Sequence, residues 1–143
     1  MLLSKKKDAF TMMEILVVVF IIGILATLVG PRVIRLLTKG NVSATQSTLA
    51  ALKTAVVEYK QDIGHFPTSK EGGLDALIDR PNIKGNEKWD GPYLEGQETV
   101  PLDAWGNEFE YNLPPIRFKN KYKIFEIVSD GPEGEDKPIS VGA

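Results

Sequence analysis

The C-terminal end of this 143-residue chain is rich in carboxylates. Four lie within seven residues, with glycines among them that permit sharp turns: Asp130, Glu133, Glu135 and Asp136. Calcium takes about six to eight hard oxygen ligands from carboxylates, carbonyls and water, and a tight acidic loop can supply them. The spacing is not that of an EF-hand, and an acidic tail is commonly just a solvated surface. From the residues alone, both interpretations stay open.

One acid, Glu14, lies inside an apolar run that extends from Phe10 to Val29. A charge at the centre of a bilayer costs roughly 2.5–3.5 kcal/mol on insertion scales, so such a group usually has a partner. A cut between Ala9 and Phe10 would create an α-amino group about one helical turn from Glu14. An amine and a carboxylate attract strongly where the dielectric constant is low. We therefore predict that they pair, within a subunit or between neighbours, where the pair would set the register of assembly.

Catalytic residues are scarce. The chain has one histidine, His65, and no cysteine, which excludes a thiol nucleophile, a disulfide and a cysteine-based zinc site. No glycine-rich phosphate loop or HExxH helix occurs. Glu108 and Glu110 would merely share one face of a strand. A net charge of -2 argues against a nucleic-acid partner. The sequence thus favours a structural protein, without a catalytic site, over an enzyme.

The apolar run is long enough to cross a membrane. Twenty residues in a helix span roughly 30 Å, about one hydrocarbon core. The preceding basic residues 5–7 should stay cytoplasmic, which directs the rest of the chain outward. A secretory signal peptide and an uncleaved anchor are the simpler alternatives. Neither explains the acid at Glu14.

The helix is expected to continue beyond the membrane, through residues 30–63. Pro31 removes a backbone donor, so a kink or local melting is expected there. Apolar or small residues then recur every three or four positions, which predicts one core-facing stripe: Val42, Thr45, Leu49, Leu52, Val56, Tyr59 and Ile63. A coiled-coil dimer is the alternative. Gly64 suits a left-handed C-terminal cap.

Residues 64–143 predict a small α+β domain, an antiparallel sheet laid on the helix with long loops. Thr68 and Glu71 have the spacing of a capping box, and a short helix should follow and end before Pro81. Strands are expected at 108–112 and 122–129, joined near 120–121. Aromatic residues should fill the core under the loops: Phe66, Trp89, Tyr93, Trp105, Phe109 and Tyr111. Asp103 is placed to bond nearby backbone amides.

The N-terminal residues, Lys-Lys-Lys-Asp-Ala followed by Phe-Thr-Met-Met-Glu and an apolar run, resemble the class III signal of type IV pilins and pseudopilins. The resemblance implies a leader at 1–9, a transmembrane and filament-core helix at 10–29, cleavage by a prepilin peptidase and methylation of the Phe10 amine. It also implies assembly roles for Phe10, Glu14 and Pro31, with unwinding near Pro31 inside the filament. Ala9 departs from the usual glycine before the cut, which predicts slower processing.

Four further stretches resemble the G-type major pseudopilin of type II secretion systems: His-Phe-Pro-Thr with Gly-Leu-Asp-Ala-Leu, Gly-Pro-Tyr, Asp-Ala-Trp-Gly-Asn, and Ile-Val-Ser-Asp-Gly. The resemblance implies a homopolymeric periplasmic pseudopilus that drives secretion of folded proteins across the outer membrane. Implied partners are minor pseudopilins and an inner-membrane assembly platform, with a secretin and exoprotein cargo contacted indirectly. Type IV pilins, the alternative, usually carry a C-terminal disulfide, which this chain cannot form.

The same resemblance implies calcium in the C-terminal loop. Glu133 stands where the family has its first aspartate, and Asp136 matches the later acidic pair after a shortening of several residues. Asp130 would contribute its side chain or its carbonyl. These three residues are the predicted ligands.

Overall fold

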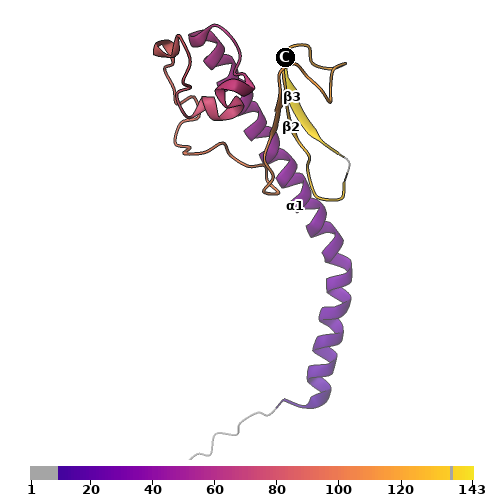
Figure 1. Ribbon diagram of the computed structural model, residues 1–143. Coiled ribbons are helices and arrows are strands. Elements are labelled where there is room, and N and C mark those ends of the chain that lie inside the picture. The colour runs from indigo at the N-terminus through magenta and orange to yellow at the C-terminus, as the bar shows by residue number, and fades with distance from the viewer. Residues whose placement is uncertain (1–9, 136) are drawn as a thin grey trace, which may run out of the picture. The chain divides into compact units, whose positions relative to one another are not determined.

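The computed structural model describes residues 10–135 and 137–143. It divides into two compact units that meet between Lys39 and Gly40. One helix, α1 (Met12–Ile63), supplies all but the first two described residues of the first unit and is also the first element of the second (Figure 1).

In the first unit, the apolar side chains of α1 are exposed. Phe20, Leu28 and Leu37 are 70%, 66% and 64% exposed. This segment is long and apolar enough to cross a membrane. The helix runs through Pro31 without interruption, so the local melting expected there is not present in the isolated chain. Proline has no N–H to donate to the carbonyl of Thr27, so α1 lacks one of its main-chain hydrogen bonds at this position.

In the second unit, the rest of α1 buries a stripe of side chains: Thr45, Leu49, Leu52, Ala55, Val56 and Tyr59. The predicted stripe is confirmed, with Val42 and Ile63 half-buried at its ends. The helix stops at Gly64, which adopts a left-handed conformation at φ 97° and donates its amide to the carbonyl of Lys60 at 2.8 Å. This is the predicted C-terminal cap.

Short 3₁₀ turns follow: η1 (Ser69–Glu71), η2 (Gly73–Leu77) and η3 (Asn86–Lys88). The predicted capping box is present, since the Glu71 carboxylate accepts from the amide and the hydroxyl of Thr68, both at 2.7 Å. The expected helix is two 3₁₀ turns rather than one α-helix. Gly72 and Gly73, at φ 98° and 63°, reverse the backbone between them, and α-helical hydrogen bonding cannot propagate through left-handed residues.

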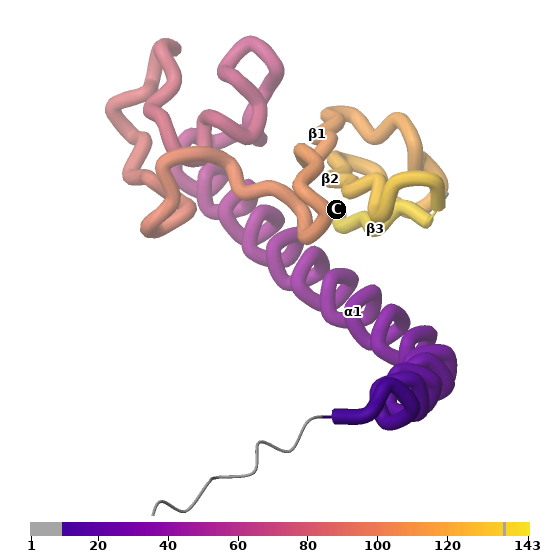
Figure 2. Tube along the Cα trace, turned by 90° about the horizontal axis from the view of Figure 1, so that it is seen from below, coloured from indigo at the N-terminus to yellow at the C-terminus, as the bar shows by residue number. Residues whose placement is uncertain are grey.

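Three antiparallel strands, in the order β1-β2-β3, make the sheet: β1 (Glu110–Asn112), β2 (Glu126–Ser129) and β3 (Ile139–Gly142). Tyr111 pairs with Ile127, which in turn pairs with Val141. The two predicted strands exist but are shorter than expected, and the turn between them lies at 119–121 as predicted. The third strand was not predicted. Figures 1 and 2 show the sheet and the 3₁₀ segment both beside this half of α1.

The core of this unit lies between α1, η2 and the sheet. Leu52, Tyr59, Phe125 and Ile127 are fully buried in it. Five of the six predicted core aromatics belong to this core or pack against it. Trp105 does not; it is half-buried, outside the core cluster. His65 is an exposed residue after the helix, as predicted, and its ring lies 3.5 Å from the Glu71 carboxylate.

Candidate functional site

The first turn of α1 holds Glu14 in a reciprocal set of hydrogen bonds. Its Oε2 accepts from the amide of Thr11 at 3.0 Å and from the Thr11 hydroxyl at 3.2 Å. The Glu14 amide donates to the Thr11 hydroxyl at 3.2 Å. This is a capping box, which satisfies amides that the first turn of a helix leaves without intrahelical partners. The arrangement fixes Glu14 at the beginning of the helix, one turn from Phe10.

Phe10 is the first described residue, and its side chain is 79% exposed. Ala9, the residue predicted to precede the cut, lies outside the described residues. Pro31 lies farther along α1 within the same unit. Of the predicted processing and assembly residues, Glu14 and Pro31 therefore lie on α1, and Phe10 lies two residues before its start.

A buried carboxylate, that of Asp103, holds the end of β2 from which the C-terminal loop starts. Asp103 accepts from the Ser129 hydroxyl at 2.7 Å and from the amides of Asn107 and Trp105 at 2.8 and 2.9 Å. Burial by itself would raise the pKa of Asp103, but these hydrogen bonds outweigh burial and hold the pKa below its usual value. The predicted bonds from Asp103 to backbone amides are confirmed, and they link the 103–107 turn to the end of β2.

The loop then turns back on itself at Gly131. The Gly131 amide donates to the Ser129 hydroxyl at 3.1 Å, and its carbonyl accepts from Asn107 at 3.2 Å. Gly131 has φ 77°, and a Cβ there would come within 3.1 Å of the Lys137 carbonyl. Only glycine fits this close approach without strain. The two ends of the loop therefore meet at Gly131.

Two of the three predicted calcium ligands, Asp130 and Glu133, are among the described residues. Asp130 pairs with the Arg117 guanidinium at 2.5 Å, Glu133 is exposed, and Asp136 lies outside the described residues. Within residues 10–135 and 137–143, no three acidic or histidine side chains gather as metal ligands. A calcium ion would compete with Arg117 for the Asp130 carboxylate. The described residues alone thus do not assemble a calcium site.

Glu126 is a structural residue that the sequence reasoning missed. Its fully buried carboxylate accepts from the amides of Ile116, Arg117 and Phe118 at 2.7–2.8 Å and from Asn112 at 3.0 Å. Burial opposes ionisation, but the amide hydrogen bonds outweigh it and lower the pKa of Glu126. The feature of the sequence that could have indicated this role is a charged residue inside a predicted strand. Its role is to hold the loop that joins β1 to β2.

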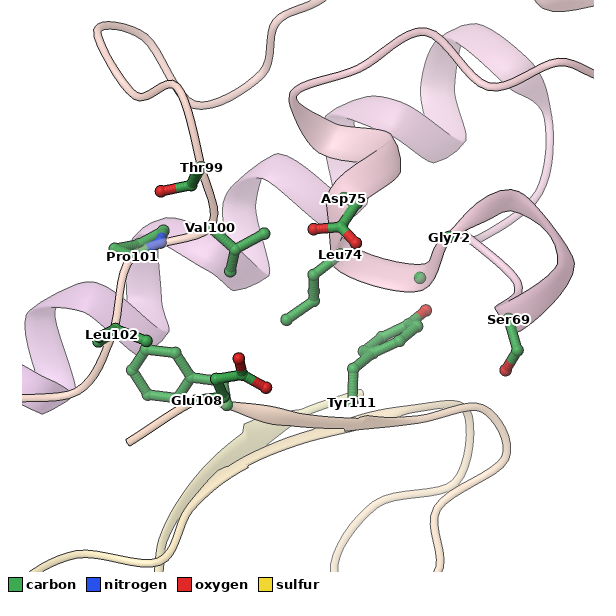
Figure 3. Close-up of a pocket in the computed structure, with 12 residues that line it drawn as sticks. Ser69, Gly72, Leu74, Asp75, Thr99, Val100, Pro101, Leu102, Glu108 and Tyr111 are labelled. Atoms are coloured by element: carbon green, nitrogen blue, oxygen red, sulfur yellow. The ribbon is translucent and has the colours of Figure 1, made fainter. Parts of the chain in front are cut away.

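A groove of about 470 Å³ lies between the 3₁₀ turns, the 99–102 segment and β1 (Figure 3). Asp75 and Glu108 point into it, beside Leu74 and Tyr111. Glu110, which the sequence placed with Glu108 on one strand face, instead pairs with Arg117 at 3.2 Å. Glu108 lies outside β1. The two glutamates therefore lie in different surroundings, Glu108 at this groove and Glu110 beside Arg117.

The fold and the N-terminal site together define a class. A long helix with an exposed apolar first half, an acid fixed at its first turn and a second half packed on a small antiparallel sheet is the architecture of pilin-like proteins. Residues 4–30 match the family described as the prokaryotic N-terminal methylation motif. Residues 32–142 match the family described as type II secretion system protein G. The chain belongs to the type II secretion system protein G family.

Curated relatives are similar in sequence to this chain over nearly its whole length. Type II secretion system core protein G of Aeromonas hydrophila is 35% identical over 95% of this chain and 92% of its own length. The Pseudomonas aeruginosa protein of the same name is 34% identical, over 96% of this chain and 95% of its own. The comparisons favour a type II secretion pseudopilin over a type IV pilin.

A solved structure shows the same fold. The crystal structure of the major pseudopilin from the type 2 secretion system of enterohaemorrhagic Escherichia coli aligns with a TM-score of 0.51 at 24% identity. The alignment covers 71% of this chain and 86% of that chain. The predicted pilin-like α+β fold is confirmed.

Proposed function

We propose that this chain is the major structural subunit of a periplasmic pseudopilus that drives type II secretion of folded proteins across the outer membrane. The observation that carries the proposal is the exposed apolar first half of α1. A soluble protein does not leave such a surface in water, because exposed apolar area is unfavourable. Lipid covers it before assembly, and other copies of the same helix cover it afterwards.

Before assembly, the subunit is a single-pass protein of the inner membrane. Basic residues 5–7 stay cytoplasmic, and residues 64–143 lie in the periplasm. A prepilin peptidase removes residues 1–9 and methylates the new amine of Phe10. Support for this topology comes from the match to the N-terminal methylation motif and from the length of the apolar helix.

During assembly, the Phe10 amine of one copy pairs with Glu14 of a neighbour. The capping box holds Glu14 at the first turn of α1, so the carboxylate is presented in a defined position. Cations are attracted to a carboxylate far more strongly in the filament core than in water, because the dielectric constant is low. The pair would fix the axial register of each incoming subunit.

The filament is a helical homopolymer that works mechanically. Its partners are minor pseudopilins and an inner-membrane assembly platform, and a secretin and the exoprotein cargo are engaged indirectly. We expect no reaction to be catalysed by the chain itself. The energy would come from a cytoplasmic ATPase of the secretion machinery.

We also propose that calcium orders the C-terminal loop. Glu133 and Asp136 would supply carboxylates, and Asp130 would supply its backbone carbonyl, because its side chain already pairs with Arg117. The closure of the loop at Gly131 brings its two ends together, which supports a compact site. The ion would tie the loop to the sheet, and no chemical step passes through it.

Mass spectrometry of the mature protein, made in cells that contain a prepilin peptidase, tests the central proposal. We expect a chain that starts at Phe10 and carries one added methyl group. An intact Met1, or a cut near Gly30, would contradict it. Exoprotein release from a deletion strain complemented with this chain then separates a pseudopilin from a type IV pilin, which would restore twitching instead.

A further inference from the structure

A second groove on the Gly40–Ala143 unit is strongly acidic. It has a volume of about 900 Å³ and lies between the second half of α1 and the loop that follows η3. Small side chains of α1 form part of its wall. Four carboxylates line it, and no lysine or arginine is among the lining residues that the structure describes: Glu58, Asp62, Asp90 and Glu95.

Hydrogen bonds through Tyr93 join the two walls of the groove. The Tyr93 hydroxyl donates to the Asp62 carboxylate at 2.8 Å and accepts from the Asp90 amide at 3.3 Å. Burial, and after it the bond to Asp62, raises the pKa of Tyr93 to about 12, so this donor stays protonated at neutral pH. The Trp89 ring packs edge-on against Tyr93 with centroids 5.6 Å apart. The acidic wall is therefore preformed.

The four carboxylates have no cationic partner within the described residues. Glu58 and Asp62 are four residues apart on one helix face, an arrangement in which like charges destabilise a helix. Asp90 and Glu95 are exposed at the opposite wall. A partner that carries cations would reduce the repulsion among these carboxylates.

A helix face of complementary charge lies elsewhere on α1. Arg32, Arg35 and Lys39 are spaced three and four residues apart, so they share one face. All three are exposed, and no ion pair between described residues involves them. No acid occurs in the sequence between Glu14 and Glu58. Apolar side chains flank these cations and are also exposed: Val33, Ile34, Leu36 and Leu37.

We propose that the acidic groove of one copy receives the Arg32–Lys39 helix face of a second copy in the filament. The inference rests on the proposed function and names the surface through which neighbouring subunits meet. Three cations meet four carboxylates, and the apolar side chains beside the cations supply contact area. Exposed charge pairs contribute little affinity, but they determine orientation and register. The contact thus selects one stagger between parallel helices.

Cysteine cross-linking tests the contact directly, because the chain has no cysteine of its own. The full-length protein carries Arg35→Cys together with Glu58→Cys or Glu95→Cys, in cells with the remaining secretion components. We expect a ladder of disulfide-linked multimers with at least one of the two pairs. Arg35→Cys with Lys53→Cys is the matched control, since Lys53 does not line the groove. Filaments without a ladder from either test pair would overturn the contact.

Charge reversal gives an independent test. We expect Arg35→Glu to lower exoprotein release by about tenfold or more, because like charges then face each other. Glu58→Arg in the same chain should restore release, and Lys53→Glu should leave it unchanged. If Arg35→Glu is harmful but Glu58→Arg does not restore release, the basic face binds something else, such as lipid phosphate, and the proposal fails.

Failure of the contact and failure of the proposed function are distinguishable. If the unmodified chain does not restore release, the proposed function is wrong, and the contact falls with it. If the unmodified chain restores release but neither the ladder nor the charge-reversal rescue appears, the contact alone is wrong.

Discussion

The carboxylate of Glu14 accepts a hydrogen bond from the amide of Thr11 at 3.0 Å, and Thr11 accepts one from Glu14 in return. The acid therefore has a role inside its own subunit besides the proposed role between subunits. A negative charge at the first turn of a helix is also favoured by the helix dipole. Substitution of Glu14 thus changes helix capping and intersubunit pairing together, and the two must be separated by experiment.

Glu14→Gln separates them. Glutamine keeps an oxygen that accepts from Thr11 but loses the charge that would attract the Phe10 amine. We expect it to remain in the membrane and to lose exoprotein release almost completely. Thr11→Ala is the counterpart, since it removes the cap at a cost of about 0.5–2 kcal/mol of helix stability and keeps the charge. Full release with Glu14→Gln would show that charge pairing is not needed.

Much of the fold was predictable because it rests on local signals. The Thr45–Tyr59 stripe follows helical periodicity, the end of α1 follows from Gly64, and Asp103 occupies a turn position that favours backbone bonding. The third strand, Ile139–Gly142, was not predicted. It has four residues, follows Pro138 and lies at the edge of the sheet, so it becomes a strand only by pairing with β2. Such non-local pairing leaves no local pattern.

The functional regions were predictable to different degrees. The N-terminal site follows from one acid in an apolar run, which is a local feature. Burial of Glu126 depends on three amides contributed by residues 116–118, which only the folded loop brings to it. Glu126 and the acidic groove both combine residues that are far apart in the sequence, so sequence spacing could not reveal them.

Removal of the Glu126 carboxylate should destabilise the second unit. Glu126→Ala leaves the three backbone amides of residues 116–118 without an acceptor, and each unsatisfied buried group costs about 1–3 kcal/mol. We expect a clear fall in the midpoint of thermal unfolding of the full chain in detergent. Glu110→Gln is the control, because Glu110 is exposed and its loss should change stability by no more than about 0.5 kcal/mol. Equal midpoints for the two variants would refute a structural role for Glu126.

The stability of the chain should fall in acid. The pKa values of Asp103 and Glu126 are lower in the folded chain than the unfolded values of about 3.9 and 4.3. Their contribution is therefore complete above the unfolded values and is lost as the pH falls through the folded values. We expect unfolding midpoints that are constant near neutrality and fall below about pH 4. Asp103→Asn should reduce this slope, and an unchanged slope would exclude Asp103 as a contributor.

Calcium should raise the unfolding midpoint of the full chain if the loop binds it. Ligand at 100 times its dissociation constant adds about 2.7 kcal/mol to the free energy of unfolding. Excess chelator should reverse the effect, and Glu133→Gln should abolish it. Glu98→Gln is a suitable control because Glu98 is an exposed acid outside the loop. A midpoint that calcium and chelator leave unchanged would remove the metal from the proposal.

Pro31 should matter in the filament more than in the isolated chain. The helix already runs through Pro31, although the Thr27 carbonyl lacks its usual amide partner there. Pro31→Ala restores that bond and favours a helix by about 3 kcal/mol. If the helix must unwind near Pro31 during assembly, the variant should give a more stable helix by circular dichroism and a lower release of exoprotein. Gln46→Ala serves as the control, because Gln46 is an exposed residue of α1 outside the acidic groove and its replacement leaves the main-chain hydrogen bonds of the helix unchanged. A Pro31→Ala variant that gains helix stability and secretes normally would show that assembly does not require unwinding at this position.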